Sequence, residues 1–401
     1  MQEINALPAA KQSKRFLCLY ALAISGGAVA YIPFLTILLP MQVSNFAGKD
    51  ALDVLAYTAF IGAIFASIAN IGFGWLSDKT RARRPWIAAG LILSCLLLAA
   101  MPLAQSAGVL MGMIICWQLC LNMMLAPLTA WAGDCVPDSQ KGLLGGLLAL
   151  APALGALSGA LVTLQGYTVA DQRLAWVAAL VALMVGPLLV FGRPIAMPQL
   201  MNSDAPLELP ANSRVQTKNA AARMWLARLL VQIAEACLFA FLLMWFQSLD
   251  PGFGENDVAK IFTIALGLAV FCALIAGRWS DRTGRPIVPL TLTSAIAAAG
   301  LFIMSAASSA QVAILGYVIF GIASSVFLAL HSSQTLRVLP QPRTRARDLG
   351  FFNLTNTVPW LIMPWLTLAL VPVYGFDALF LLLASLAIIA CILLLTMPKQ
   401  R

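Results

Sequence analysis

Charged residues are scarce in this sequence, at 10% of 401 positions, whereas soluble globular domains carry about 25%. That scarcity excludes a soluble enzyme and a disordered chain. The eight cysteines form no Cys-x-x-Cys pair, so a disulfide scaffold and a thiolate metal site are both disfavoured. We therefore expect no disulfide, no metal site and no cofactor.

Catalytic motifs are also missing. The chain has no His-Glu-x-x-His, no Gly-x-Ser-x-Gly and no P-loop, which disfavours a membrane enzyme. The net charge of +9 comes without any nucleic-acid-binding motif. We expect no nucleic-acid partner, and we explain the charge by membrane topology.

Long apolar runs are what the sequence does contain. Hydrophobic residues make up 61% of the chain, and runs of about 20 cross a bilayer core about 30 Å thick. Barrel strands would be alternating segments of about 10 residues, and helices satisfy every backbone group within one segment. We predict an all-α membrane protein with twelve transmembrane helices, at 16–40, 53–76, 86–104, 108–133, 142–165, 173–192, 223–247, 257–279, 287–306, 310–336, 348–370 and 376–397.

The basic residues orient these spans. Most Lys and Arg residues lie in the two tails and the even-numbered loops, whereas Lys49, Arg173 and Lys260 lie in odd-numbered loops. Because cytoplasmic loops carry the excess of Lys and Arg, both termini are expected in the cytoplasm of a cell (inner) membrane. The first apolar run is longer than that of a cleaved signal peptide.

The chain divides into two similar halves. A polar, proline-rich segment at 193–222 is interpreted as a cytoplasmic linker between a six-helix bundle at 1–192 and another at 223–401. Each half carries a similar motif after its second span, with Asp78 and Asp281 lying 203 positions apart. Pro137 and Pro340 show the same separation. Such repeats predict a pseudo-symmetric transporter with its site between the halves.

On these motifs the chain resembles a major facilitator superfamily transporter over essentially its full length. The second-half copy, Gly277 through Arg285, matches the loop signature G-x3-D-[RK]-x-G-R of that superfamily, whereas Arg81 replaces the glycine in the first half. The first-half sequence SDKTRARRPW more closely resembles the loop motif of the glycoside/hexuronide–cation symporter and sucrose-transporter branch. The resemblance implies a major facilitator fold and alternating access.

The resemblance also implies a gate at the cytoplasmic end. Asp78 would cap the eleventh span and Asp281 the fifth, because a carboxylate is favoured at a helix N-terminus. Arg83 would add an ion pair, and contacts made only in one state bias the equilibrium between states. The alternative is that these charges only set topology. The proposed gate residues are Asp78, Arg81, Arg84, Asp134, Asp281, Arg282, Arg285 and Arg337.

Titratable side chains within the membrane indicate a proton pathway. Arg228, Gln232 and Glu235 lie at i, i+4 and i+7 on one face of the seventh span. A neutral Glu235 that ionises on contact with water or a partner would carry a proton, whereas Arg228 could pair with it or extend to the headgroups. His331, the single histidine, is a second relay candidate or a structural residue.

Amide and aromatic side chains of other spans suit a hydroxylated solute. Amides donate and accept hydrogen bonds, and an aromatic face can stack on a sugar ring, although interhelical hydrogen bonding is the alternative for each amide. The candidate substrate-binding residues are Gln118, Asn122, Trp117, Gln232, Asn353, Asn356, Trp360, Tyr31 and Ser324. Tyr57 is a weaker candidate.

We therefore expect a monomeric proton-coupled importer of a small polar organic solute, with a sugar or glycoside as first choice and the lipid bilayer as its surroundings. Melibiose-type symporters bind cations through acids on spans one and four, which carry none here, so the proton is the expected coupling ion. The alternative is proton-driven efflux of drugs or metabolites, because Gly146, Gly155 and Gly159 match part of an antiporter signature. A transporter-like sensor is a third possibility.

Overall fold

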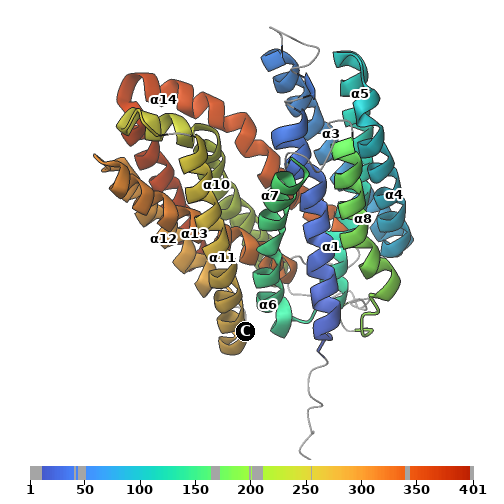
Figure 1. Ribbon diagram of the computed structural model, residues 1–401. Coiled ribbons are helices and arrows are strands. Elements are labelled where there is room, and N and C mark those ends of the chain that lie inside the picture. Colours follow the sequence, from blue (N-terminus) through green and yellow to red (C-terminus); the bar gives the residue numbers. More distant parts are fainter. Residues whose placement is uncertain are drawn as a thin grey trace, which may run out of the picture.

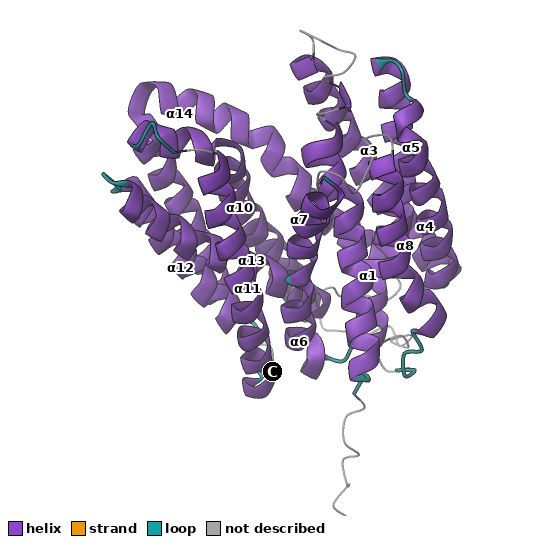
Figure 2. Ribbon diagram, viewed as in Figure 1, coloured by secondary structure: helices purple, strands orange, loops and turns teal. Residues whose placement is uncertain are grey.

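The computed structural model describes residues 11–39, 42–43, 51–163, 172–197, 200, 211–253, 255–338 and 344–397. Two helical bundles, one from each half of the chain, stand side by side (Figure 1). Every regular element in the described ranges is helical (Figure 2). The predicted all-α fold with two six-helix halves is confirmed.

The N-terminal bundle contains the first six predicted spans. Ser13 and Ser106 cap two of its helices by accepting hydrogen bonds from Phe16 N and Val109 N. The fifth span is divided into two helices by a turn at Ala149. The elements are α1 (Lys14–Pro33), η1 (Phe34–Leu38), α3 (Ala51–Thr80), α4 (Arg83–Ala100), η3 (Met101–Leu103), α5 (Ala107–Cys135), α6 (Asp138–Leu148), α7 (Leu150–Val162) and α8 (Arg173–Phe191).

The C-terminal bundle contains the other six spans in five helical elements. The eleventh and twelfth spans form one element that is interrupted at Gly375, whose φ of 76° is left-handed and readily accessible only to glycine. The elements are α10 (Ala211–Leu249), α11 (Glu255–Thr283), α12 (Val288–Ser305), α13 (Ala310–Val338) and α14 (Arg345–Leu395).

The seventh span begins earlier than the sequence suggested. The linker was expected to extend to residue 222, but α10 starts at Ala211. Hydropathy reports where lipid contact ends, whereas helical hydrogen bonding continues into polar sequence that lacks proline and glycine, as 211–222 does. Lys49 and Pro340, which supported the orientation and the repeat, lie outside the described residues.

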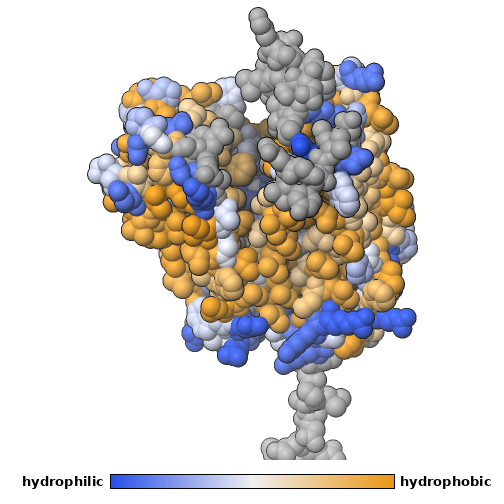
Figure 3. All heavy atoms as spheres, viewed as in Figure 1, coloured by the Kyte–Doolittle hydropathy of each residue, from blue (hydrophilic) through white to orange (hydrophobic). Residues whose placement is uncertain are grey.

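The chain is an integral membrane protein. Within the described ranges, eleven helices are long and apolar enough to cross a bilayer, the last of them covering Trp365–Leu395. Figure 3 shows an apolar belt around the molecule with hydrophilic side chains at its two ends. The side chains exposed on this belt include Ile92, Leu183 and Phe302.

The two bundles meet at the end of the molecule that carries both termini, which we call the basal end (Figure 1). It comprises the start of α1, the turns after α3 and α11, and the end of α14. There α6 packs against α11 and α13, while α3 and α5 pack against α14. Toward the opposite, apical end the bundles diverge, and Figure 3 shows a hollow between them.

Glycines allow the closest helix contacts within each bundle. A β-carbon on Gly90 of α4 would lie 2.8 Å from the Cys120 carbonyl oxygen of α5. A β-carbon on Gly300 of α12 would lie 2.7 Å from Phe320 N of α13. Small residues of this kind let the backbones of neighbouring membrane helices approach each other.

We predict that Gly90→Ala lowers the thermal stability of the detergent-solubilised protein. The added methyl group would collide with the α5 backbone, and overpacking of this kind costs about 1–3 kcal/mol. Thermal unfolding followed by tryptophan fluorescence measures the change. Gly112→Ala is the control, because no atom lies within 4 Å of its β-carbon position; an equal loss in both variants would contradict the packing argument.

Candidate functional site

Each bundle supplies a carboxylate to a helix N-terminus of the other bundle. Asp281, at the end of α11, accepts hydrogen bonds from Gly142 N at 2.8 Å and Leu143 N at 2.7 Å in α6. Asp78, at the end of α3, accepts from Ala346 N at 3.2 Å and Arg347 N at 3.1 Å in α14. These positions are those implied by the family resemblance, and both contacts close the basal end.

The glycine of each loop motif makes this capping geometrically possible. A β-carbon on Gly74 would lie 2.6 Å from the carbonyl oxygen of Ala346. A β-carbon on Gly277 would collide with the carbonyl oxygen of Gly142. Four residues before its aspartate, each glycine thus lets one helix backbone lie directly against the N-terminal part of its partner helix.

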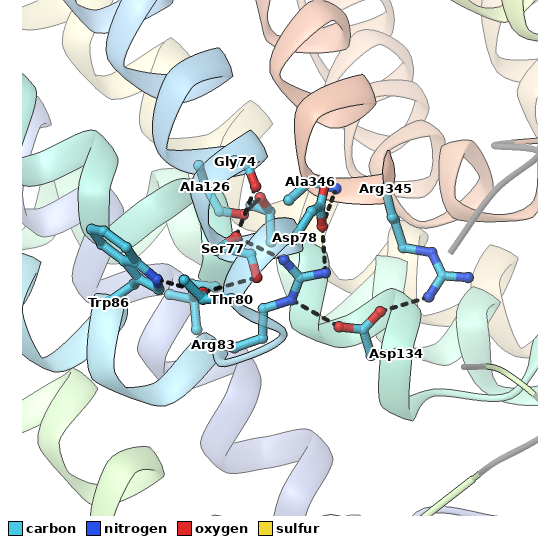
Figure 4. A network of polar contacts seen from close by, with 12 residues as sticks. Gly74, Ser77, Asp78, Thr80, Arg83, Trp86, Ala126, Asp134, Arg345 and Ala346 are labelled. Carbon is cyan, nitrogen blue, oxygen red and sulfur yellow. Dashed lines mark hydrogen bonds and ion pairs between the residues drawn. The ribbon is translucent and has the colours of Figure 1, made fainter. Parts of the chain in front are cut away.

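A chain of ion pairs extends from the first of these caps (Figure 4). Arg83 bridges Asp78 at 2.7 Å and Asp134 at 2.9 Å. Arg345, at the start of α14, pairs with the other oxygen of Asp134 at 2.7 Å. All four side chains are 10% exposed or less, so removing one would leave a buried charge without its partner.

Other expected gate residues do not take part. Arg81, Arg84, Arg282 and Arg285 are exposed and form no ion pair with a described residue, so their role in the gate stays a prediction. The side chain of Arg337 lies outside the described part of the chain.

The sequence did not single out several residues of the junction. Lys141 of α6 is 3% exposed and donates to the Leu336 carbonyl oxygen of α13 at 3.4 Å. Ser67 of α3 and Thr357 of α14 share a hydrogen bond of 3.2 Å between the bundles. Polarity was the only sequence signal for these residues, and it does not identify a partner.

The polar stripe of α10 lies above this junction. Arg228 donates to the Leu328 carbonyl oxygen at 3.3 Å and to Ser332 Oγ at 3.0 Å, both in α13. It also donates to Asn356 Oδ1 of α14 at 3.3 Å. The guanidinium group therefore points into the bundle, where all three of its hydrogen-bond acceptors are neutral, and it does not extend to the headgroups.

Glu235 occupies the other end of the stripe. Its carboxyl group forms no ion pair with any described residue, but it lies within electrostatic range of Arg228 on its own helix and of Tyr31 in α1. Tyr31 belongs to the opposite bundle and is 39% exposed. Between Arg228 and Glu235, the buried Oε1 atom of Gln232 has no hydrogen-bond partner in the described structure.

The amides of α14 join this cluster. Asn356 donates to Asn353 Oδ1 at 2.6 Å while accepting from Arg228. Trp360, one turn further along, is 47% exposed and packs edge-on against Phe239 of α10 at 5.8 Å. The structure thus brings together Arg228, Gln232, Glu235, Asn353, Asn356 and Tyr31.

The remaining candidates lie elsewhere. Trp117 is fully buried against Phe34, with ring centroids 4.9 Å apart, so it is a core residue rather than part of a binding surface. Asn122 donates to the Gln118 carbonyl oxygen and accepts from Asn70 Nδ2, each at 2.9 Å. This buried network joins α3 to α5, and Asn70 is a member that the sequence did not indicate.

Ser324 and His331 are also buried. Ser324 bonds back to the Gly321 carbonyl oxygen within α13 at 3.3 Å. His331 is 0% exposed and lies 2.9 Å from the Met224 carbonyl oxygen and 3.1 Å from Thr335 Oγ1. Both ring nitrogens have partners, so a relay role is not supported and the structural alternative accounts for this histidine.

The chain belongs to the major facilitator superfamily. The model of the Major Facilitator Superfamily matches residues 3–160, 56–340 and 224–401, which together cover nearly the whole sequence. Membership makes the chain a transporter, as the two pseudo-symmetric bundles and the cross-capped junction indicate.

Three solved structures share this fold at low identity. A human organic anion transporter, TETRAN, is 15% identical with a TM-score of 0.74, covering 95% of this chain and 99% of its own. The Escherichia coli fucose:proton symporter is 17% identical with a TM-score of 0.74, covering 96% and 99%. A bacterial homologue of the iron transporter ferroportin, in an outward-facing state, is 14% identical with a TM-score of 0.71, covering 96% and 99%. No curated protein matches the chain significantly.

We predict that Asp281→Ala opens the basal end. Loss of the two hydrogen bonds at the α6 N-terminus costs about 1–2 kcal/mol, and it acts only on the state in which they form. With the native cysteines replaced, maleimide labelling of Ser333→Cys, a buried position of α13, should accelerate roughly tenfold. Asp257→Ala at the other end of α11 is the control; equal labelling in both variants would contradict the capping role.

Proposed function

We propose that the chain is a proton-coupled symporter that imports a small polar organic solute. The observation that carries this proposal is the cluster of Arg228, Glu235 and Asn356, in which Arg228 bonds Asn356 while Arg228 and Glu235 lie within electrostatic range of Tyr31 of the opposite bundle. A carboxyl group that forms no ion pair with a described residue can change its protonation state when water or solute arrives. Alternating access would then expose the cluster to each side in turn.

The solute class follows from the hydrogen-bonding groups around this carboxyl. Asn353 and Asn356 each carry donors and acceptors, and the Gln232 Oε1 atom is a buried acceptor without a partner. A hydroxyl group that donated to this atom would satisfy it. Together with the similarity of the first-half loop to sugar and glycoside symporters, these groups favour a sugar or glycoside.

The direction of transport rests on the orientation of the chain. Exposed arginines of the basal end, Arg81, Arg84, Arg282 and Arg285, suit the cytoplasmic face under the positive-inside rule. The apical hollow then opens to the outside of the cell membrane. A monomer is sufficient for this mechanism, because both halves of the site come from one chain.

The glycine pattern that suggested efflux has a packing explanation. Gly146 lies against the Ala273 carbonyl oxygen of α11, where a β-carbon would be 2.8 Å from it. Gly155 and Gly159 lie against Ile32 and Ile37 at the end of α1 and in η1. These contacts are needed whichever way solute moves, so the pattern does not favour antiport.

Currents on a solid-supported membrane test the proposal in proteoliposomes. The solutes are sugars, glycosides, small organic acids and lipophilic cations, each with and without a proton gradient. We expect inward positive current with a neutral sugar or glycoside. A response confined to lipophilic compounds and driven by an opposing proton gradient would assign the chain to efflux.

We predict that Glu235→Gln abolishes solute accumulation driven by a proton gradient while solute exchange continues, because the amide cannot bind and release the coupled proton. Uptake of radiolabelled solute into proteoliposomes measures both modes. Asp250→Asn is the matched control, since this exposed residue follows α10. Accumulation by Glu235→Gln at the wild-type level would show that another group carries the proton.

We predict that Asn356→Ala raises the KM for the solute roughly tenfold. The substitution removes the hydrogen bonds of Asn356 with Arg228 and Asn353 and the expected bond with the solute, and each such bond contributes about 0.5–1.5 kcal/mol. Concentration dependence of the transport current measures KM. Ser385→Ala on the same helix is the control, since its hydroxyl bonds only within α14. An unchanged KM in Asn356→Ala would remove α14 from the binding site.

A further inference from the structure

A pocket of about 400 Å³ opens at the basal end of the N-terminal bundle, and all the residues that line it belong to that bundle. Its walls come from the turn between α3 and α4, the end of α5 and the segment that follows α8. Arg81, Arg84 and Arg193 line it together with Arg83 and Asp134. The transport site proposed above uses neither this space nor its exposed arginines.

The pocket carries a large excess of positive charge. Its single carboxylate, Asp134, is already bonded to Arg83 and to Arg345 of α14. The three other arginines are exposed and form no ion pair within the described ranges. Four guanidinium groups therefore surround a volume in which one carboxylate is present and fully engaged.

One of these arginines is held in place by neutral groups. Arg84 donates to the carbonyl oxygen of Gly192, and its guanidinium lies 5.3 Å from the ring centroid of Trp131. A cation over an indole face is attracted by the ring without being neutralised. Arg84 is thus fixed at the pocket while its charge remains available to a ligand.

Arg81 adopts a backbone conformation that is unfavourable for arginine. Its φ is 52°, and no other described residue except glycine has a positive φ. The matching position of the second repeat, three residues after Asp281, is Gly284 with φ 64°. The two turns have the same shape, but the first half places arginine where glycine would be unstrained.

We propose that this pocket binds a phosphate group, either as a lipid headgroup or as a soluble phosphate ester. Guanidinium groups bind phosphate oxygens through paired, charge-assisted hydrogen bonds, and a strained residue that lines a pocket indicates a function for its side chain. The first-half turn retains Arg81 because its guanidinium contributes to this site. The inference does not depend on the identity of the transported solute.

Thermal unfolding of the detergent-purified full chain tests the proposal. Inorganic phosphate is compared with chloride at equal ionic strength, and nanodiscs containing phosphatidylglycerol are compared with nanodiscs containing phosphatidylcholine. A ligand that binds only the folded state raises the melting temperature. We expect stabilisation by phosphate, by phosphatidylglycerol or by both, and the responding arm identifies the source.

The variants give opposite effects that a general charge effect would not produce. Arg81→Gly should raise the melting temperature without ligand by about 1–3 °C, since strain is relieved, and should weaken phosphate or phosphatidylglycerol binding about tenfold. Arg193→Ala should weaken binding without raising stability. Arg285→Ala removes an exposed basal arginine beside Gly284 and should leave binding unchanged.

Two results would overturn the proposal. One is the absence of stabilisation by either ligand in the wild-type protein. The other is an equal loss of binding in Arg285→Ala and Arg81→Gly, which would show that overall surface charge, rather than this pocket, attracts the phosphate. Gly284→Arg supplies a reciprocal test. It should lower the melting temperature, because the positive φ strains an arginine. It should not raise the affinity for phosphate, because no atom lies within 4 Å of the β-carbon position and no pocket wall is present there.

Discussion

Each bundle of this transporter donates a carboxylate to a helix N-terminus of the other, and the closed basal end depends on that exchange. Asp281 reaches α6 and Asp78 reaches α14. A helix N-terminus carries a partial positive charge that favours a carboxylate, and at the start of α14 Asp78 also accepts from first-turn amides that have no partner within the helix. Because both contacts join the bundles, any motion that separates the basal ends must break them together.

This constraint organises the rest of the molecule. The glycines that precede the aspartates bring backbones into contact, and the chain of charges from Arg83 to Arg345 is enclosed between them. With the bundles held at one end, they diverge at the other. The charged residues of the α10 stripe lie within electrostatic range of Tyr31 of α1. A reorientation of the bundles would change the environment of Glu235 without any change in its own helix.

Much of the fold could be predicted from the sequence. The spans followed from apolar runs whose length matches a bilayer, and the two-bundle arrangement followed from the repeat of Asp78 at Asp281. The start of α10 could not be predicted, because helical hydrogen bonding extends beyond the lipid-facing sequence. The break at Ala149 depends on local backbone geometry that hydropathy does not report, whereas the interruption at Gly375 falls in the gap predicted between the eleventh and twelfth spans.

The candidate site divides along a similar line. Helical spacing was sufficient to place Arg228, Gln232 and Glu235 on one face, because i, i+4 and i+7 positions always share a face. Spacing could not decide what that face contacts. Trp117 was grouped with the binding residues as an aromatic side chain beside Gln118, although it packs against Phe34 in the core.

By itself, the sequence determined that this protein crosses the membrane many times, in two related halves with acidic loop motifs and a polar stripe in the seventh span. These properties follow from composition and from the spacing of residues along one chain. Only the tertiary structure decided which residues are partners across the chain. It paired Asp134 with Arg345, buried His331 and brought three exposed arginines around one pocket. Such contacts depend on how helices pack and rotate against each other, and the spacing of residues along the sequence does not contain that information.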